Sequence, residues 1–181
     1  MNPKIMNRRK GSVIAMIDQI AKRASVRRFK DEPVSAEAVT ELLRAAMAAP
    51  SGGNQQPWEF YVVRDADLRA KLAAASPYAK CAAVAPVVIV PCVRGNIPLP
   101  ECAPMDMSAA IENLLLECVN QGLGGVWMAI EGYPDRIEGV RTALDIPSNL
   151  TPFALVPCGI PDGEVNAQGP SRFDASRIHE R

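Results

Sequence analysis

The stretch from Ala49 to Phe60, APSGGNQQPWEF, constrains the fold more than any other part of the sequence. Pro50 cannot continue the helical pattern before it, because its ring removes a helix hydrogen bond. Trp58 opens an apolar run that is typical of a strand. The residues between them are two glycines, one hydroxyl and three side-chain amides, which suit a flat heterocycle such as a flavin or a nucleobase. A turn rich in Gly and Asn between helix and strand has the same composition.

A second polar cluster lies 20 to 30 residues earlier. Arg23, Ser25, Arg27 and Arg28 fall within six residues. Arginine matches a phosphate bidentately, and a serine hydroxyl adds one more donor. The cluster therefore suggests an anion site. The alternative is that the arginines are solvated surface charges, with Arg23 supporting the C-terminus of the preceding helix.

Hydrophobic periodicity predicts alternating helices and strands. The expected helices cover 12–24, 36–48, 66–74, 105–122 and 134–144, with a brief helical turn at 78–80; Ser35 and Asp65 are expected N-caps, and a glycine of 123–125 the C-cap of the longest helix. The expected strands cover 59–63, 84–93, 126–130 and 151–158. Pro86 and Pro91 favour an edge position for the second strand, or an end near each proline. The segment 95–104 reads as a loop, either a lid or a rigid connector.

Length and charge limit the classes of protein. A chain of 181 residues suits a single domain over 1–181. Residues 1–11 are basic, and disorder is one interpretation of them. Residues 160–181 are expected to form an extended polar tail. Lys plus Arg equals Asp plus Glu at 20 each, so no net charge attracts nucleic acid or anionic lipid. No apolar run approaches a membrane span, and no signal peptide is recognisable. We therefore expect a cytoplasmic protein that binds neither nucleic acid nor membrane.

The cysteines and the single histidine argue against metal and triad chemistry. Five cysteines without a Cys-x-x-Cys pair, and His179 as the one histidine, give no ligand-spaced cluster and no nucleophile–histidine pair. Four cysteines lie in apolar surroundings and should be inert free thiols, whereas Cys102 lies in the proline-rich loop and should be the accessible one. With no metal and no catalytic side chain in evidence, the chemistry is expected on an organic cofactor.

Three blocks together resemble the FMN-dependent nitroreductase family: RASVRRF at 23–29, APSGGNQQPW at 49–58 and GLGGVW at 122–127. The segments 146–159 and 172–179 are similar to the last strand and the closing segment of that family. The resemblance covers nearly the whole chain. It implies an α+β fold, in which a mostly antiparallel sheet is sandwiched by helices, and an interlocked homodimer with FMN at its interface.

The resemblance also implies roles for individual residues. Arg23 and Arg172 would hold the FMN phosphate, with Ser25 beside them, and Arg27 would face the N1/O2 side of the ring. Ala24 belongs to the same segment, but family members often carry a polar or basic residue there, so the phosphate site is leaner in this chain. The other subunit would supply a second set across the ring and ribityl chain, namely Pro50, Ser51, Gly52, Asn54 and Gln56. Met128 and Ala129 would present backbone near flavin N5.

The activity that the resemblance implies is reduction of a nitroaromatic or quinone by NADH or NADPH. The mechanism would be ping-pong hydride transfer at FMN N5, with no protein side chain as catalyst and no metal. Flavin cleavage and dehalogenation occur in the same family, and a non-catalytic flavin-binding or flavin-delivery protein is an alternative from another class. The segment 95–104 shows no set of residues that would bind a zwitterion, which counts against dehalogenation.

Overall fold

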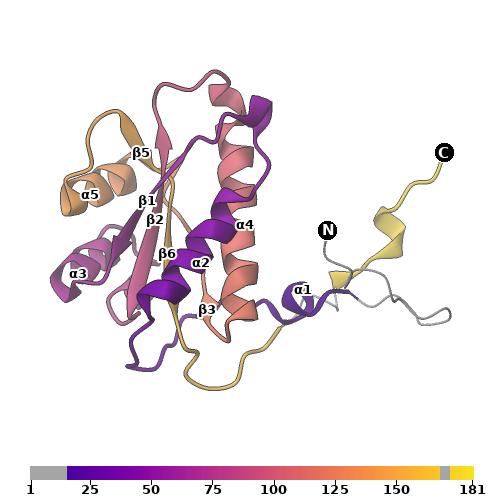
Figure 1. The fold of residues 1–181 in the computed structure, drawn as a ribbon, viewed down its shortest axis with the longest axis horizontal. Helices are drawn as coiled ribbons and strands as arrows, with labels where there is room; N and C mark the ends of the chain where they lie inside the picture. The colour runs from indigo at the N-terminus through magenta and orange to yellow at the C-terminus, as the bar shows by residue number, and fades with distance from the viewer. Residues whose placement is uncertain (1–15, 168–171) are drawn as a thin grey trace.

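The computed structural model describes residues 16–167 and 172–181, and its centre is a six-stranded sheet (Figure 1). The main path of the sheet has the order β1-β2-β6-β3, while β5 pairs with β2 and β4 with β6. Every one of these pairings is antiparallel. The strands are β1 (Trp58–Val63), β2 (Val87–Arg94), β3 (Gly124–Gly125), β4 (Met128–Ala129), β5 (Leu150–Pro152) and β6 (Ala154–Gly159).

Helices cover both faces of the sheet, as the α+β prediction required (Figure 1). Helices α2 (Ala36–Met47) and α4 (Ala103–Asn120) pack on one face, and α3 (Ala66–Ala74) and α5 (Pro134–Leu144) on the other. The alternation of side chains along β2 explains both layers. Val87 and Ile89 belong to the apolar cluster under α2 and α4, whereas Val88 and Val90 belong to the cluster under α3 and α5.

The predicted helix boundaries hold at most ends. The Ser35 hydroxyl accepts from Ala38 N (3.0 Å), and Asp65 Oδ1 accepts from Leu68 N (2.9 Å), so both are N-caps. The longest helix ends differently from the prediction. Its terminating glycine is Gly122, with φ of 71°, because glycine alone adopts the left-handed region without cost there. The glycines at 124 and 125 instead form β3.

The prediction of an edge position for β2 is wrong, since β1 flanks it on one side and β5 and β6 flank it on the other. Pro86 does precede the strand, but Pro91 lies inside it, opposite Phe60. Cys92 pairs with Pro152, and Ile89 pairs with Val156. Between these two pairs, the segment of β5 and β6 therefore has one residue more than β2. That bulge divides the expected strand 151–158 into β5 and β6, and at this break in the ladder the missing N–H of Pro91 is tolerated.

Two other segments differ from the prediction. The apolar run 126–130 contributes only Met128–Ala129 as a strand. The first helix, α1, covers only Asp18–Lys22, while the start of the expected helix lies outside the described residues, as do residues 1–11. Short 3-10 segments occupy Gly52–Asn54, Lys80–Ala82, Pro100–Cys102 and Ala175–Arg177, so the expected turn near 78–80 falls two residues later.

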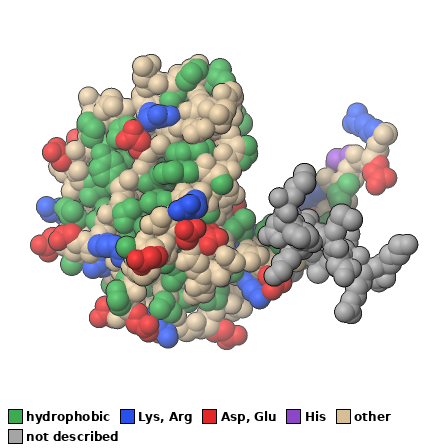
Figure 2. All heavy atoms as spheres, in the orientation of Figure 1, with side chains coloured by type: hydrophobic (Ala, Val, Ile, Leu, Met, Phe, Trp, Pro, Cys, Tyr) green, Lys and Arg blue, Asp and Glu red, His purple; other side chains and the backbone are tan. Residues whose placement is uncertain are grey.

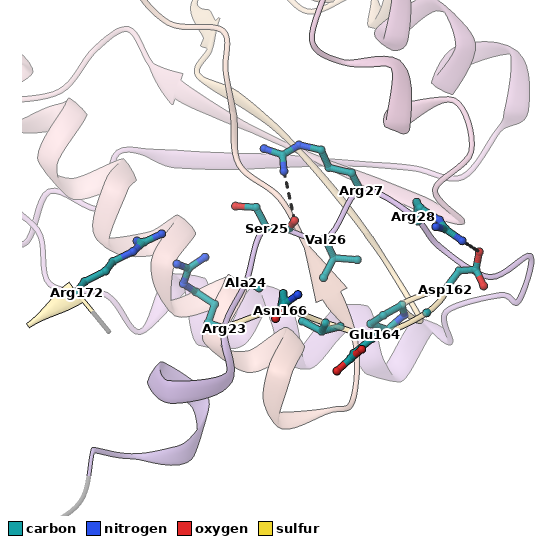
Figure 3. Close-up of a pocket in the computed structure, with 13 residues that line it drawn as sticks. Arg23, Ala24, Ser25, Val26, Arg27, Arg28, Asp162, Glu164, Asn166 and Arg172 are labelled. Atoms are coloured by element: carbon teal, nitrogen blue, oxygen red, sulfur yellow. Dashed lines mark hydrogen bonds and ion pairs between the residues drawn. The ribbon is translucent and has the colours of Figure 1, made fainter. Parts of the chain in front are cut away.

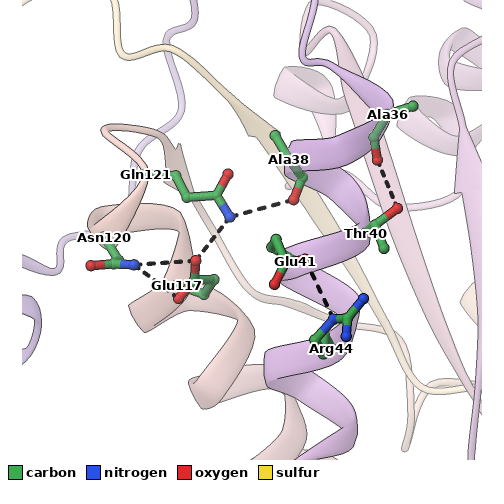
Figure 4. Close-up of polar contacts among 8 residues, drawn as sticks. All are labelled: Ala36, Ala38, Thr40, Glu41, Arg44, Glu117, Asn120 and Gln121. Atoms are coloured by element: carbon green, nitrogen blue, oxygen red, sulfur yellow. Dashed lines mark hydrogen bonds and ion pairs between the residues drawn. The ribbon is translucent and has the colours of Figure 1, made fainter.

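A polar contact joins the two helices on the α2–α4 face (Figure 4). Gln121 Nε2 donates to Glu117 Oε1 (2.8 Å) on α4 and to Ala38 O (3.5 Å) on α2. Asn113 Nδ2 on α4 donates to Ala45 O on α2 (3.2 Å), nearer the other end of α2. These bonds fix α4 against α2, so that the N-terminal end of α4 lies beside the loop that follows α2.

Helix α1 and the tail 172–181 form an arm beside the sheet and its helices (Figure 1). The end of this tail stands clear of the main body in the space-filling view (Figure 2). Apolar side chains on the tail and on or just before α1 are exposed to between 43% and 77%, namely Met16, Ile17, Ile20, Phe173 and Ile178. No helix within residues 16–167 and 172–181 is long and apolar enough to cross a membrane.

Candidate functional site

A cavity of about 450 Å³ brings together the arginine segment 23–28, the segment 161–166 and Arg172 (Figure 3). Backbone bonds hold the arginine segment in place. Val26 N donates to Gly125 O of β3 (3.0 Å), and Lys30 N donates to Ile160 O (2.9 Å). The segment thus extends along β3 and the chain leaving β6. The sequence-predicted residues Arg23, Ala24, Ser25, Arg27 and Arg172 all line this one cavity.

The arginines of the cavity differ in their partners. Arg28 pairs with Asp162 (3.1 Å) and points away from the others, and Arg23 Nε lies 3.2 Å from Glu112 Oε1 of α4. Arg27 makes one long bond to Ser25 O (3.4 Å). No ion pair of Arg27 or Arg172 occurs with any described residue. The cavity therefore holds cationic donors available to an anion, with the Ser25 hydroxyl between them (Figure 3).

An adjoining cavity of about 420 Å³ connects the arginines to β4. Arg23 and Ser25 line it together with Trp127 and Ala129. Ala129 is exposed, and its carbonyl accepts from Arg136 Nη1 (3.2 Å). Met128 is buried, and its sulfur lies 3.9 Å from Cys81 Sγ, so its side chain packs in the core. The third block of the sequence is thus adjacent to the first.

The amide-rich loop 50–56 has an internally braced backbone. Gly53, Asn54 and Gln56 all have positive φ (55°, 55° and 47°), which is uncommon for residues other than glycine. Ser51 Oγ accepts from Gln56 N (3.0 Å), and Gln56 Nε2 donates to Asn54 Oδ1 (3.0 Å). Backbone in sparsely populated conformations is characteristic of ligand-binding loops, where the surroundings enforce it.

Two residues that the sequence analysis did not name support this loop. Asp106 of α4 accepts from Gly52 N (2.9 Å) and from Gln55 Nε2 (2.7 Å). Arg94, at the end of β2, donates to Gln55 O (3.0 Å) and to Gln56 O. One signal for Asp106 was present in the sequence. It follows the spacing of the apolar stripe of α4, where a carboxylate is costly unless it has hydrogen-bond partners.

The two halves of the predicted site do not meet within one chain. Neither cavity has any residue of 50–56 in its lining. The loop is attached to the first turn of α4 through Asp106, whereas Gln19, just before the arginine segment, bonds to Asn120 in the last turn of α4 (3.1 Å). Fourteen residues of helix separate these attachment points, which corresponds to about 21 Å.

Comparisons with known proteins agree with this architecture. The family model described as "Nitroreductase family" matches residues 20–78 and 78–160. A protein of Methanothermobacter thermautotrophicus, provisionally named NADH dehydrogenase/NAD(P)H nitroreductase, is 34% identical over 174 residues, covering 94% of this chain and 88% of its own length. Iodotyrosine deiodinase 1 of Rattus norvegicus matches over 53 residues only, at 42% identity, which is 29% of this chain and 19% of that protein.

Solved structures give the same result. A protein of Clostridium acetobutylicum, provisionally named NADH oxidase, superposes with a TM-score of 0.86 at 40% identity, covering 90% of this chain and 98% of that one. A Clostridium difficile protein described as an FMN-dependent nitroreductase superposes with a TM-score of 0.84 at 27% identity, covering 91% and 98%. Sequence and fold together show that this chain belongs to the nitroreductase family of oxidoreductases.

Proposed function

We propose that this protein is an FMN-dependent oxidoreductase that works as a homodimer and uses NADH or NADPH to reduce a small planar acceptor, a nitroaromatic or a quinone. The observation that carries the proposal is the cavity in which Arg23, Arg27 and Arg172 surround Ser25. The name of the C. difficile relative, an FMN-dependent nitroreductase, supports the choice of cofactor. The nitroreductase name of the M. thermautotrophicus relative supports the electron donor.

The residues present fit an FMN phosphate and ring. Arg23 and Arg172 would hold the phosphate, since a guanidinium fork matches phosphate oxygens, and Ser25 would add a hydroxyl donor. Exposed Ala129 would place backbone beside the ring, in the cavity that continues from Ser25. Ala24 adds only backbone and a methyl group, so the phosphate set here rests on two arginines and one hydroxyl.

A second copy of the chain would complete the site. Pro50, Ser51, Gly52, Asn54 and Gln56 line neither of the two cavities in their own chain, and their loop is attached at the opposite end of α4. The arm formed by α1 and the tail carries exposed apolar side chains, which is a feature of surfaces that bind other proteins. A homodimer in which the arm of each copy covers the other would bury these side chains and bring the two halves together.

Bound FMN would supply the redox chemistry, by accepting a hydride at N5 from NAD(P)H and passing electrons to the acceptor. The protein would bind, orient and polarise. Arg27 would place a fixed cation at the N1/O2 side of the ring, and the loop 50–56 would supply donors and acceptors to its edge. No side chain is required to take or give a proton.

Reconstitution and reduction test the proposal. The purified protein, incubated with FMN and freed of excess, is expected to elute as a dimer and to absorb near ~450 nm, as bound flavins do. In an anaerobic stopped-flow experiment, NADH or NADPH should bleach this band, and a nitroaromatic or quinone should restore it. Failure to retain FMN would contradict the cofactor proposal, and retention of FMN by a strict monomer would contradict the proposed homodimer.

Two alternatives have distinct outcomes in the same experiment. A flavin-delivery protein would retain FMN that neither nicotinamide nucleotide bleaches. The partial match to iodotyrosine deiodinase keeps dehalogenation as a second enzymatic candidate. A protein with that activity would release halide from a halotyrosine when reduced with dithionite, and would turn over nitroaromatics and quinones poorly.

A further inference from the structure

Asp106 is the one buried carboxylate among residues 16–167 and 172–181, with a relative exposure of 5%. No cation of the described residues pairs with it. Its two oxygens have separate tasks: Oδ1 accepts from Gly52 N (2.9 Å), and Oδ2 accepts from Gln55 Nε2 (2.7 Å). Its position in the first turn of α4 places the charge at the positive end of the helix dipole.

The Gln55 amide that Asp106 holds is also paired with the backbone of Leu99. Gln55 Nε2 donates to Leu99 O (2.8 Å), and Leu99 N donates to Gln55 Oε1 (2.9 Å). One side-chain amide thus closes a ring with both polar groups of a single residue in the segment 95–102. The same segment contacts the loop a second time, because a methyl group at Gly52 would lie 2.9 Å from Cys102 Cβ.

The direction of these bonds depends on the carboxylate. An ionised carboxylate only accepts hydrogen bonds, so it can face only the NH₂ end of Gln55. With the NH₂ end fixed on Asp106, the amide oxygen faces Leu99 N and the remaining amide hydrogen faces Leu99 O. A flipped amide would lose both bonds to Leu99. The carboxylate at position 106 therefore stabilises the same orientation of Gln55 that the N–H and C=O of Leu99 require, and that joins the two segments.

We propose that Asp106 is a positioning residue that holds the amide of Gln55 in one orientation and thereby fixes the segment 95–102 against the loop 50–56. We call this set of hydrogen bonds among Asp106, Gln55 and Leu99 the lock. The lock itself is independent of the ligand. Its role in a cofactor site rests on the proposed function, in which the loop 50–56 lies against FMN of the partner subunit. Asp106 would then act on FMN through Gly52 and Gln55, without touching it.

Hydrogen exchange on the full-length protein tests the lock directly. Leu99 lies between Pro98 and Pro100, so its amide is isolated from neighbouring amides, and protein labelled with ¹⁵N-leucine and ¹⁵N-glycine reports Leu99 and Gly52 in one NMR experiment. In Asp106→Asn the new amide oxygen can still accept from Gly52 N, but its NH₂ group faces the NH₂ group of Gln55. We expect exchange at Leu99 to accelerate about tenfold and exchange at Gly52 to change less than about threefold.

Two further variants separate the lock from general destabilisation. Gln55→Leu removes the amide and keeps Asp106, and it should give the same split between Leu99 and Gly52. Asp67→Asn is the matched control, because it also removes a carboxylate from the first turn of a helix, and it should change neither amide. Equal acceleration at Leu99 and Gly52 in Gln55→Leu, or unchanged exchange at Leu99 in either variant of the lock, would overturn the proposal.

Exchanging the two groups provides a rescue test. In Asp106→Asn/Gln55→Glu, the Asn amide can donate to the Glu carboxylate, which also accepts from Leu99 N, while the bond to Leu99 O is replaced by a contact between two acceptors. The double variant should protect Leu99 better than Asp106→Asn alone, and no recovery would count against the lock.

The role of Asp106 in FMN binding is measured in a separate experiment. The dissociation constant of FMN, measured by flavin fluorescence, should be about tenfold higher in Asp106→Asn than in wild type. The double variant should recover part of this affinity. Unchanged FMN affinity together with faster exchange at Leu99 would overturn the role in the site and leave the lock. Wild-type protein that binds no FMN would instead contradict the proposed function, while the exchange data would still decide the lock.

Discussion

Gly124 packs its bare Cα against Val26, so closely that a methyl group at position 124 would lie 2.5 Å from Val26 Cγ2. This contact joins two of the three sequence blocks that characterise the family. Because Val26 lies between Ser25 and Arg27, the absence of a side chain at Gly124 sets how near the arginine segment approaches β3. The glycine is needed for this close approach of the chain.

Gly124→Ala should therefore disturb the cofactor cavity as well as the core. Overpacking of this kind destabilises a protein by about 1–3 kcal/mol, and displacement of Val26 would move Ser25 with it. We expect a lower midpoint of urea unfolding and weaker FMN binding. Gly139→Ala in α5 is the control, since its methyl group would meet Ala75 Cβ at 3.1 Å, far along the chain from the arginine segment. Normal FMN affinity in Gly124→Ala would show that the contact does not position the site.

The sequence predicted those parts of the fold that local chemistry determines. The N-cap at Ser35 and the start of α5 at Pro134 follow from properties of single residues, and both occur as expected. The central position of β2 was not predictable in this way. It depends on the register with β5 and β6, where a bulge opposite Pro91 removes the penalty that a proline normally carries inside a sheet.

The candidate site was predictable to a similar extent. Residue types and spacing identified the arginine segment and the loop 50–56, because the polar groups of each segment are close in sequence and are of the types that suit phosphate or a heterocycle. The supporting residues were not found, because they are distant in sequence from the loop. Asp106 accepts from Gly52 and Arg94 donates to Gln56, and each partner is 38 residues or more away. Only the three-dimensional arrangement brings them together.

Thiol reactivity should separate Cys102 from the other cysteines. Cys81, Cys92, Cys118 and Cys158 are buried, and Cys102 is partly exposed and adjacent to Gly52. We expect native protein to react rapidly with one equivalent of a thiol reagent under reducing-agent-free conditions, and all five thiols to react after denaturation. Cys102→Ala should abolish the rapid phase. Any rapidly reacting group in that variant would contradict the burial pattern. Bound FMN should slow the reaction if the loop 50–56 covers it.

The stability of the protein should fall in alkaline solution because of Cys92. Burial, with a smaller contribution from Glu59, raises the pKa of the Cys92 thiol to about 12, from an ordinary value of 9.0. Below pH 9 the thiol is protonated in both folded and unfolded chains. Between pH 9 and 12 the unfolded chain loses this proton while the folded chain keeps it, so the free energy of unfolding decreases by at most about 1.4 kcal/mol per pH unit for this group.

Urea unfolding between pH 8 and 10.5, with a reducing agent present, measures this loss. Burial also raises the pKa of the Cys81 thiol, so wild type should show a combined slope. Cys92→Ala should have a shallower slope, whatever its absolute stability. Val90→Ala, which changes a buried side chain of the same strand but removes no titratable group, should keep the wild-type slope. Equal slopes in wild type and Cys92→Ala would refute the assignment to Cys92.

Different arginines of the cavity should determine the affinity for FMN and the midpoint potential of bound FMN. Arg23 and Arg172 would face the phosphate, whose charge is the same in both redox states, so Arg23→Ala and Arg172→Ala should weaken FMN binding with little change in midpoint potential. Arg27 would face N1/O2, where the reduced ring carries negative charge. A cation there stabilises the reduced state more than the oxidised one, and only such a difference changes the potential.

Arg27→Ala should therefore lower the midpoint potential of bound FMN. An interaction of about 1–3 kcal/mol corresponds to tens of millivolts for a two-electron couple. Arg28→Ala is the matched control, because Arg28 lies in the same segment but pairs with Asp162 and points away from Ser25 (Figure 3). Redox titration and FMN affinity, measured on all four variants, decide the assignment. If Arg27→Ala leaves the potential unchanged, or Arg23→Ala shifts it equally, then the arginines act only as a collective positive charge, and the orientation of the ring inferred from Arg27 is wrong.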